Sequence, residues 1–370
     1  MPHPLMDRSC LRLNPLSERE NKVRIESAQV TPDTAPRPLN DQARNTVAET
    51  ADRMRRARRE GRPVIMAFGA HAIKAGLGPV LIRLLEERWL QHLATNGAGI
   101  IHDWELAYQG CTSEDVRANV REGRFGMWEE TGFHLNLAFL LGARAGRGYG
   151  ESIGHLIEAG AHDVPTREEL LRDVAAAGRG GEAAERAAAA ADILRAFDRG
   201  LLKPGRIVVA HPHKRFSVQA AAYRNGVPFT GHPMIGHDII YVHPLNSGAA
   251  IGRTAERDFL CFANQVAGIE GGVYLSVGSA VMSPMIFEKT LSMAQNLARQ
   301  SGPAITDHFM AVVDLAESHW DWSRGEPPSS APDYYLRYCK TFSRMGGTMR
   351  YASADNRDFL LTLCRELGVH

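Results

Sequence analysis

The chain has 370 residues, a formal net charge of +1 at pH 7 and 44% hydrophobic residues. This length suits one large α/β domain or two small ones. The net charge is close to zero, so the overall charge gives no reason to expect nucleic acid or an acidic membrane as a partner. The five cysteines are scattered without a CxxC pair, so neither a disulfide framework nor a thiolate zinc site is predicted. No apolar run approaches the roughly 20 residues of a membrane helix, and the polar start does not resemble a signal peptide. We therefore expect a cytoplasmic protein.

The first 45 residues are rich in Pro, Arg, Asn and Asp and lack hydrophobic periodicity. This composition predicts a flexible arm over residues 1–45, loose or docked on a neighbouring subunit. A charged helix is predicted over 45–61, closed by Gly61. We expect residues 46–370 to form a single domain.

Predicted strands and helices alternate along the rest of the chain. A strand over 62–71, a helix over 76–89 and a strand over 90–99 make a β-α-β unit. Further strands are predicted within 205–213, 227–244, 271–284, 307–316 and 347–367, with helices over 217–226, 285–300 and at the end of the chain. The Ala-rich region 166–200 is typical of surface helices around a glycine break. The alternation predicts an α/β fold with a doubly wound, mostly parallel sheet of the Rossmann-like kind.

Four predicted strand ends carry small or polar residues: FGAH (68–71), TNGAG (95–99), VGSA (277–280) and SADN (353–356). Ligands of open α/β sheets lie beyond such ends, where glycine lets the backbone approach a phosphate and helix N-termini offer free N–H groups. The candidate cofactor-binding residues are Thr95, Asn96, Gly97, Gly99, Gly278, Ser279, Ala354 and Asp355, with Asp103 or Asp355 to hold ribose hydroxyls. The spacing is not GxGxxG, and each turn alone is also consistent with a tight β-α connection.

Histidines are concentrated in one part of the chain. Five lie within 33 residues: His211, His213, His232, His237 and His243. An HxH pair on a strand directs both rings to one face, and with Asp238 such a group could bind zinc or iron. No HExxH pattern occurs, however, and the His-Pro pairs indicate turns. Structural or substrate-lining histidines are the alternative, and we predict no metal site.

Lys340 lies in the aromatic segment PDYYLRYCKTF. In an apolar setting the pKa of a lysine can fall, and its neutral amine then acts as a nucleophile that forms an imine. The alternative is a surface lysine whose stem passes the aromatic rings. Cys339 is expected to be a packing residue.

The order of these motifs resembles the deoxyhypusine synthase family over about residues 60 to 366. "LQHLATNGAGIIHD" is similar to the family's strand and "TTAGG…D" turn, and "SVQAAAYRNGVPFTGHPMIGHDIIYVH" is similar to its "A.KN.IPVF.PA" helix and "GDM..FH" segment. "SVGSAVMSPMIFEK" resembles the family's "GGG" turn, "HFMAVVDLA" its "YAVYINTA" strand, "PDYYLRYCK" its "PDEAVSWGK" segment and "SADNRDFLL" its "ADATL" turn. The TNGAG turn is also similar to the "GNA…HD.E" turn in the ornithine-cyclodeaminase-type domain of arginine-degrading enzymes.

The resemblance implies NAD as cofactor, wrapped by the TNGAG turn with Asp103 at the mouth of the site. It implies that hydride leaves an amine carbon and returns to the same NAD, while a carbon fragment passes through an imine on Lys340. It also implies a homotetramer with sites at subunit interfaces, which the arm could reach.

Several family residues differ in this chain. Tyr334 replaces a glutamate, Tyr338 a tryptophan and Cys339 a glycine, and an acidic segment is replaced by GEPPSSA. Carboxylates that would neutralise a polyamine are thus lost, which predicts a substrate other than spermidine. The family's active-site histidine has no match in VGSAVMSP, and His232, His237 or His243 could supply the missing acid-base group. We predict Lys340, His237 and Asp238 as catalytic residues.

Three functions follow as hypotheses. The first is an NAD-dependent enzyme acting on an amine or amino acid through a lysine imine, either a deoxyhypusine synthase-like transferase or a cyclodeaminase-type lyase. The second is a metal-dependent hydrolase that uses the histidines. The third is a non-catalytic protein that binds NAD or ADP-ribose.

Overall fold

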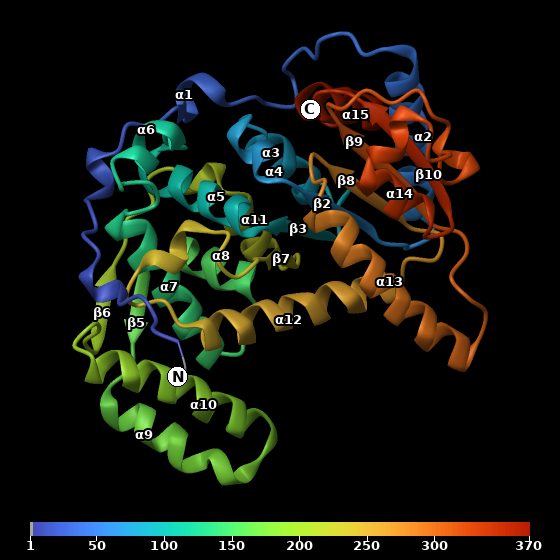
Figure 1. The fold of residues 1–370 in the computed structure, drawn as a ribbon. Helices are drawn as coiled ribbons and strands as arrows, with labels where there is room; N and C mark the ends of the chain where they lie inside the picture. The colour runs from blue at the N-terminus through green and yellow to red at the C-terminus, as the bar shows by residue number, and fades with distance from the viewer. Residues whose placement is uncertain (1–2) are drawn as a thin grey trace.

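A six-stranded parallel sheet forms the centre of the computed structural model, which describes residues 3–370 (Figure 1). Its strands are β2 (Val64–Phe68), β3 (His92–Asn96), β7 (Phe229–His232), β8 (Val273–Val277), β9 (Phe309–Asp314) and β10 (Thr348–Ser353). They lie in the order β10-β9-β8-β2-β3-β7, and every neighbouring pair is parallel. The predicted doubly wound parallel α/β fold is confirmed.

The order of the strands places the reversal of the chain beside β2. From β2 the chain adds β3 and β7 on one side, then crosses to add β8, β9 and β10 on the other. Numbered along the chain, the order is 3-2-1-4-5-6, that of the Rossmann dinucleotide-binding sheet. In such sheets a crevice opens at the carboxyl ends of the two strands where the order reverses, here β2 and β8.

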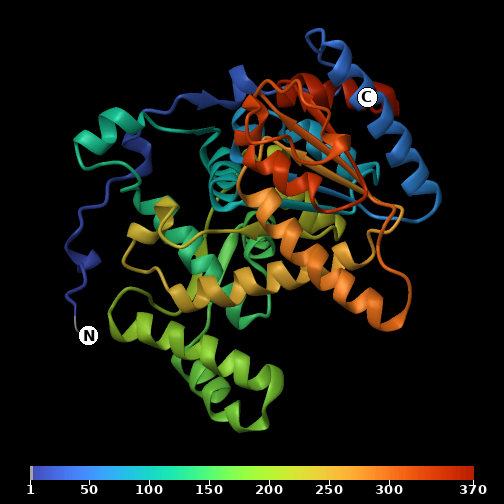
Figure 2. The same ribbon diagram turned by 45° about the vertical axis from the view of Figure 1, so that its right-hand side comes forward.

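Both faces of the sheet are covered by helices, so its strands are nearly continuous apolar runs. In β2, Val64, Met66 and Phe68 belong to one core, while Ile65 and Ala67 belong to the core on the other face. The first face is covered by α2 (Asp41–Arg59), α4 (Gly78–Glu86), α5 (Gly97–Gln109), α11 (Val218–Asn225) and α15 (Asn356–Leu367). The second is covered by α12 (Gly248–Ala267), α13 (Met282–Ser301) and α14 (Arg337–Ser343), which Figure 2 shows in front of the sheet.

A helical extension lies beside the β7 edge of the sheet. It contains α7 (Glu129–Arg144), α8 (Tyr149–Ala159), β5 (Ala161–Val164), α9 (Arg167–Ala175), α10 (Gly181–Asp198) and β6 (Gly205–Val208). The prediction of surface helices over 166–200 is confirmed. The strand predicted over 205–213 forms as β6, but it pairs antiparallel with β5 and is wrong as a member of the main sheet. Three of its four residues are exposed, so β6 lacks the two buried faces of a central strand.

The segment before α2 packs on its own chain, which corrects the expectation of an arm that is loose or docked on a neighbour. It contains β1 (Val23–Arg24) and α1 (Ile25–Ala28), and β1 pairs antiparallel with β4 (Cys111–Thr112). Leu16 and Arg19 are 1% and 6% exposed. The physical reason is that Arg19 forms a buried ion pair with Glu105 of α5. The short helices α3 (Ala70–Lys74) and α6 (Val116–Arg121) complete the fold.

Across residues 3–370, none of the helices combines the length and the apolar character that a membrane span requires.

Candidate functional site

Two glycine turns touch where the strand order reverses. Gly69 follows β2 and Gly278 follows β8, and a Cβ added to Gly69 would lie 2.1 Å from the Gly278 carbonyl oxygen. Gly278 has a φ of +58°, in the left-handed region that favours glycine, and a Cβ there would lie 2.2 Å from Nδ2 of Asn356. Asn356 is 6% exposed, and its Oδ1 has no hydrogen-bond partner among the described residues. The reversal point therefore combines closely packed backbone with one buried, unpaired acceptor.

The TNGAG turn joins β3 to α5 and meets a loop from much later in the chain. The Oγ1 of Thr95 donates to the Phe68 carbonyl at 2.8 Å, and the side chain of Asn96 caps α5 by accepting from the Gly99 amide at 2.9 Å. A Cβ on Gly97 would lie 2.1 Å from Oδ2 of Asp238. The structure thus brings together two predicted site segments, the turn and the His237–Asp238 pair.

The Asp238 carboxyl group lies in a poorly solvated place. Burial raises its pKa to about 6, although nearby His237 opposes the shift. Its Oδ2 is buried without a hydrogen-bond partner in the described chain, as are the hydroxyl groups of Tyr149 and Tyr241. A carboxyl group of this kind can exchange a proton near neutral pH or accept hydrogen bonds from a ligand.

Asp238 borders a cavity of about 200 Å³ at the carboxyl edge of the sheet, which we name the carboxyl-edge cavity. Its walls come from the end of α3, one face of α5, residues 113–125 and the loop after β7. The charged or titratable residues in the walls are Arg19, Lys74, His102, Glu105, Glu114, His237 and Asp238. Groups of both signs therefore face one small space.

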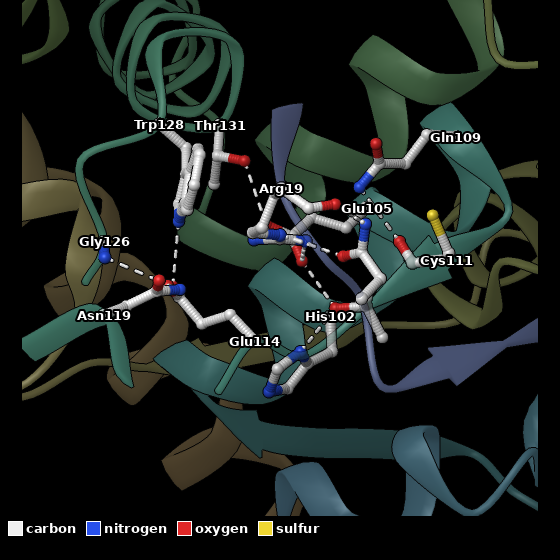
Figure 3. Close-up of polar contacts among 12 residues, drawn as sticks. Arg19, His102, Glu105, Gln109, Cys111, Glu114, Asn119, Gly126, Trp128 and Thr131 are labelled. Carbon is white, nitrogen blue, oxygen red and sulfur yellow. Dashed lines mark hydrogen bonds and ion pairs between the residues drawn. The ribbon is translucent and has the colours of Figure 1, made fainter. Parts of the chain in front are cut away.

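A buried network around Glu105 forms one wall (Figure 3). Arg19 donates to both carboxylate oxygens of Glu105, at 2.8 and 2.7 Å, and Thr131 donates at 2.9 Å. Burial alone would raise the pKa of Glu105, but the charge and hydrogen bonds of Arg19, together with the other polar neighbours, outweigh burial and lower it. The carboxylate therefore stays charged, and it also accepts a hydrogen bond from the Thr112 hydroxyl group.

The hydrogen bonds of this network define the protonation of His102. The Thr112 hydroxyl donates its one proton to Glu105, so it accepts from Nδ1 of His102, 2.7 Å away. The proton of the neutral ring is then on Nδ1, and Nε2 is left as an acceptor. Burial lowers the pKa of His102 to about 4, which keeps the ring neutral. His102 is not among the residues predicted from the sequence, although its spacing from Ala98 and Glu105 places the three on one helix face.

Glu114 holds the opposite wall in place. It accepts hydrogen bonds from Trp128 Nε1 at 2.9 Å, Asn119 Nδ2 at 2.6 Å and the Gly126 amide at 3.2 Å (Figure 3). Its role is therefore to order the segment between β4 and α7.

Asp103 has a different role from the one predicted. It is 1% exposed and accepts from the Ser217 hydroxyl, the amides of Val218 and Gln219, and the Gln219 side chain. These bonds cap α11, which corrects the expectation that Asp103 lies at the mouth of the site. The physical reason is that the N-terminal amides of α11 need an acceptor, and Asp103 supplies it.

The other predicted cofactor residues lie at the expected strand ends. Ser279 accepts from the Ser283 amide at 3.2 Å, and the Ala354 amide donates to the Asp314 carbonyl at 2.9 Å. Asp355 caps α15 and forms an ion pair with Arg37 at 3.1 Å. A Cβ on Gly99 would lie 2.2 Å from Thr95 Oγ1, so this glycine packs against β3.

Lys340 is on α14, on the second face of the sheet. Its Nζ is 3.0 Å from Glu326 Oε1 and 3.3 Å from the centre of the Tyr334 ring. The Arg344 and Lys340 hydrogen bonds lower the pKa of Glu326. Lys340 is not among the residues that line the carboxyl-edge cavity, so the structure does not bring it together with His237 and Asp238.

The five clustered histidines do not come together as a ligand set. His232 bonds to Thr230, His243 lies 3.4 Å from Glu129, and His237 is exposed. A different trio is close in space, in which His134 stacks on His162 and His211 lies near both. Within residues 3–370 no group of three or more His, Cys, Asp or Glu side chains is arranged to hold a metal ion.

No protein-family model matches the sequence, and no curated protein matches it. Among solved structures the chain is similar to AgrE in its ternary complex with ornithine and NAD+, at 15% identity and a TM-score of 0.44, over 90% of this chain and 34% of that one. It is also similar to ArgZ, an arginine dihydrolase from the ornithine-ammonia cycle in cyanobacteria, at 16% identity and a TM-score of 0.41, over 89% and 32%. A putative deoxyhypusine synthase from Entamoeba histolytica is 10% identical with a TM-score of 0.37, over 87% and 86%.

The chain thus spans about a third of the length of the arginine-metabolising proteins that it matches. At these identities and TM-scores the likeness carries no conclusion about substrate or reaction.

Proposed function

We propose that this protein is an NAD-dependent enzyme that acts on a small amine or amino acid at the carboxyl edge of its sheet. The observation that carries the proposal is the strand order 3-2-1-4-5-6 with touching glycine turns at the reversal point. Dinucleotides bind in such crevices, and the two glycines let the turns after β2 and β8 pack against each other at this point.

The cofactor would lie across the turns after β2, β3, β8 and β10. The residues proposed to hold it are Thr95, Asn96, Gly97, Gly99, Gly278, Ser279, Ala354 and Asp355, to which the structure adds Gly69 and Asn356. Asn356 Oδ1 is a buried acceptor that a ribose hydroxyl would satisfy. The nicotinamide supplies hydride transfer, and the protein supplies orientation and proton transfer.

The carboxyl-edge cavity suits a ligand that carries both charges. Lys74 offers a cation to a carboxylate, and Asp238 offers an unpaired oxygen to an ammonium group. His102 has a neutral ring with Nε2 available, so it can accept a hydrogen bond from a substrate ammonium. Asp238, whose pKa is raised to about 6, can exchange a proton with a substrate amine, and the exposed His237 lies beside it.

The imine on Lys340 stays a prediction, and so does the choice between a transferase and a cyclodeaminase-type lyase. Lys340 would have to leave Glu326 to reach the cavity. This contact favours a second candidate function, a protein that binds NAD or ADP-ribose without turnover. The homotetramer also stays a prediction.

Native mass spectrometry with and without NAD, combined with calorimetry, tests the proposal. We expect about one NAD per chain, and a loss of affinity of roughly tenfold or more in Gly69→Ala, because its new Cβ meets the Gly278 carbonyl. Gly252→Ala is the matched control, since a Cβ there meets nothing within 4 Å. A folded protein that ignores NAD would refute the cofactor assignment.

Lys340→Ala separates the two candidates. Borohydride trapping of an amine on the wild-type chain but not on this variant would support the imine. Unchanged NAD binding without trapping in either protein would favour the non-catalytic candidate.

A further inference from the structure

A second cavity lies away from the carboxyl ends of the strands. It encloses about 520 Å³ beside the amino end of β7, and we name it the β7-edge cavity. Its walls are the glycine-rich segment 146–151 that leads into α8, one face of α11, residues 226–230 and the middle of α12. Figure 1 shows α8, α11 and α12 grouped around β7. No residue of this cavity lines the carboxyl-edge cavity.

One wall holds a buried carboxyl group without a cationic partner. Asp258 is 4% exposed, and its Oδ2 accepts from the amides of Gly150 at 2.8 Å and Gly231 at 2.6 Å. No Lys or Arg of residues 3–370 forms an ion pair with it. Burial raises its pKa to about 8, and the carboxylate of Glu151 adds to the shift.

Another wall holds a buried acceptor, the side-chain carbonyl of Gln219. Gln219 is 1% exposed, and its Nε2 donates to the Ile100 carbonyl at 3.1 Å and to Asp103 at 2.9 Å. These two bonds fix the side-chain amide, while Oε1 has no hydrogen-bond partner among the described residues. An unpaired buried carbonyl destabilises a fold, and a donor from a ligand in the cavity would remove that cost.

Two charged residues of opposite sign, Glu151 and Arg257, complete the polar lining of the cavity. Glu151 caps α8 by accepting from the Gly148 amide at 3.3 Å. Arg257 directs Nη1 to the carbonyls of Ala143 and Arg147, at the end of α7. The amides at the start of α8 already face Asp258, so an anion would find no free donors there.

We propose that the β7-edge cavity binds a small organic cation, a primary ammonium with a short apolar body. The ammonium donates to Gln219 Oε1, to the Glu151 carboxylate and to Asp258, whose carboxyl group releases its proton to water when the cation binds; all three residues line the same cavity. The apolar body lies against Ala222, Phe229 and Leu260. The match is chemical, because an ammonium has three donors and no acceptor.

Isothermal titration of the full chain with n-butylammonium chloride, and with butan-1-ol as the neutral partner of equal length, tests this site. We expect saturable binding of the amine that Cys261→Trp removes, because Cys261 lines the cavity and is partly exposed there, so the indole fills the space. Glu151→Gln keeps a capping side chain but loses the charge, and should weaken binding roughly three- to tenfold. Glu256→Gln is the matched control, an exposed α12 residue outside the cavity lining.

Circular dichroism establishes that each variant is folded before its titration is interpreted. Equal binding of butan-1-ol and the amine would overturn the proposal, because the cavity would then recognise apolar bulk alone. Equal effects of Glu151→Gln and Glu256→Gln, or full binding by folded Cys261→Trp, would overturn it as well. So would the absence of saturable amine binding to the wild-type chain.

Discussion

At the scale of single residues, the contact between Gly97 and Asp238 ties the TNGAG turn to the loop after β7. Asp238 occupies the volume where any other residue at position 97 would carry its Cβ. The carboxyl group thereby stays at the start of α5, buried and with its pKa raised to about 6. One glycine thus positions a titratable group in the proposed site.

Gly97→Ala should displace Asp238 and weaken NAD binding roughly tenfold or more, because the new Cβ and the carboxylate need the same space. Titration calorimetry measures the affinity, and thermal melting separates it from a loss of stability. Gly252→Ala, on α12, is expected to leave the affinity unchanged and to raise the melting temperature slightly, because alanine favours a helix interior. An unaltered affinity in folded Gly97→Ala would contradict the placement of the cofactor at this turn.

At the scale of elements, the segment before α2 is a structural part of the domain. It supplies Arg19 to Glu105, and both side chains are almost fully buried. Removing one partner of a buried ion pair leaves an uncompensated charge and costs about 3–5 kcal/mol. By contrast, Arg8 makes partly buried hydrogen bonds to Tyr241 and Asn246, which contribute about 1 kcal/mol each or less.

Deleting residues 1–20 should therefore lower the free energy of unfolding by at least about 3–5 kcal/mol, since buried Leu16 is lost as well, whereas deleting residues 1–12 should cost far less. Urea denaturation followed by circular dichroism measures both. Glu105→Gln in the shorter chain should recover part of the loss, because it removes the unpaired charge. Equal stabilities of the two truncated chains would show that the Arg19 pair does not stabilise the fold.

At the scale of the whole molecule, buried neutral histidines determine how stability depends on pH. Burial, reinforced in several cases by neighbouring charges, lowers the pKa of six histidines. The pKa is about 3 for His92, His162 and His232 and about 4 for His102, His134 and His211. Below pH 6.5 the unfolded chain binds more protons than the folded chain, so stability falls as pH falls. Asp258, whose pKa is raised to about 8, acts in the opposite direction but is outnumbered.

Each such histidine removes about 1.4 kcal/mol per pH unit below pH 6.5 until its folded pKa is reached. Against a total stability of about 5–15 kcal/mol, six of them should unfold the protein cooperatively near pH 5. Tryptophan fluorescence during an acid titration, with proton uptake measured in parallel, checks this. A native signal that persists at pH 4 would contradict it.

His211→Phe provides the matched variant for this titration. Neither ring nitrogen of His211 has a hydrogen-bond partner in the described chain, and its ring packs edge-on against Trp104 and Tyr108. The Val209 backbone only partly offsets the fall in its pKa. The variant should therefore unfold at a lower pH and take up about one proton fewer.

The sequence by itself determined the local elements and the turns that end them. Apolar runs closed by glycine or small polar residues predicted β2, β3, β8, β9 and β10, because a strand buried on both faces has that composition whatever its neighbours are. The same runs identified Thr95–Gly99, Gly278–Ser279 and Ala354–Asp355 as strand ends. β6 was also predicted as a strand, but a short apolar run does not specify which strand it pairs with, and β6 pairs with β5 outside the main sheet.

Only the tertiary structure decided which distant groups meet. It put β8 beside β2 and so located the reversal point, placed Asp238 against Gly97, turned Asp103 to the start of α11 and paired Lys340 with Glu326. It also joined Arg19 to Glu105 and thereby oriented His102. The physical reason is that each of these contacts depends on packing between segments far apart in the chain, which local composition and periodicity do not specify.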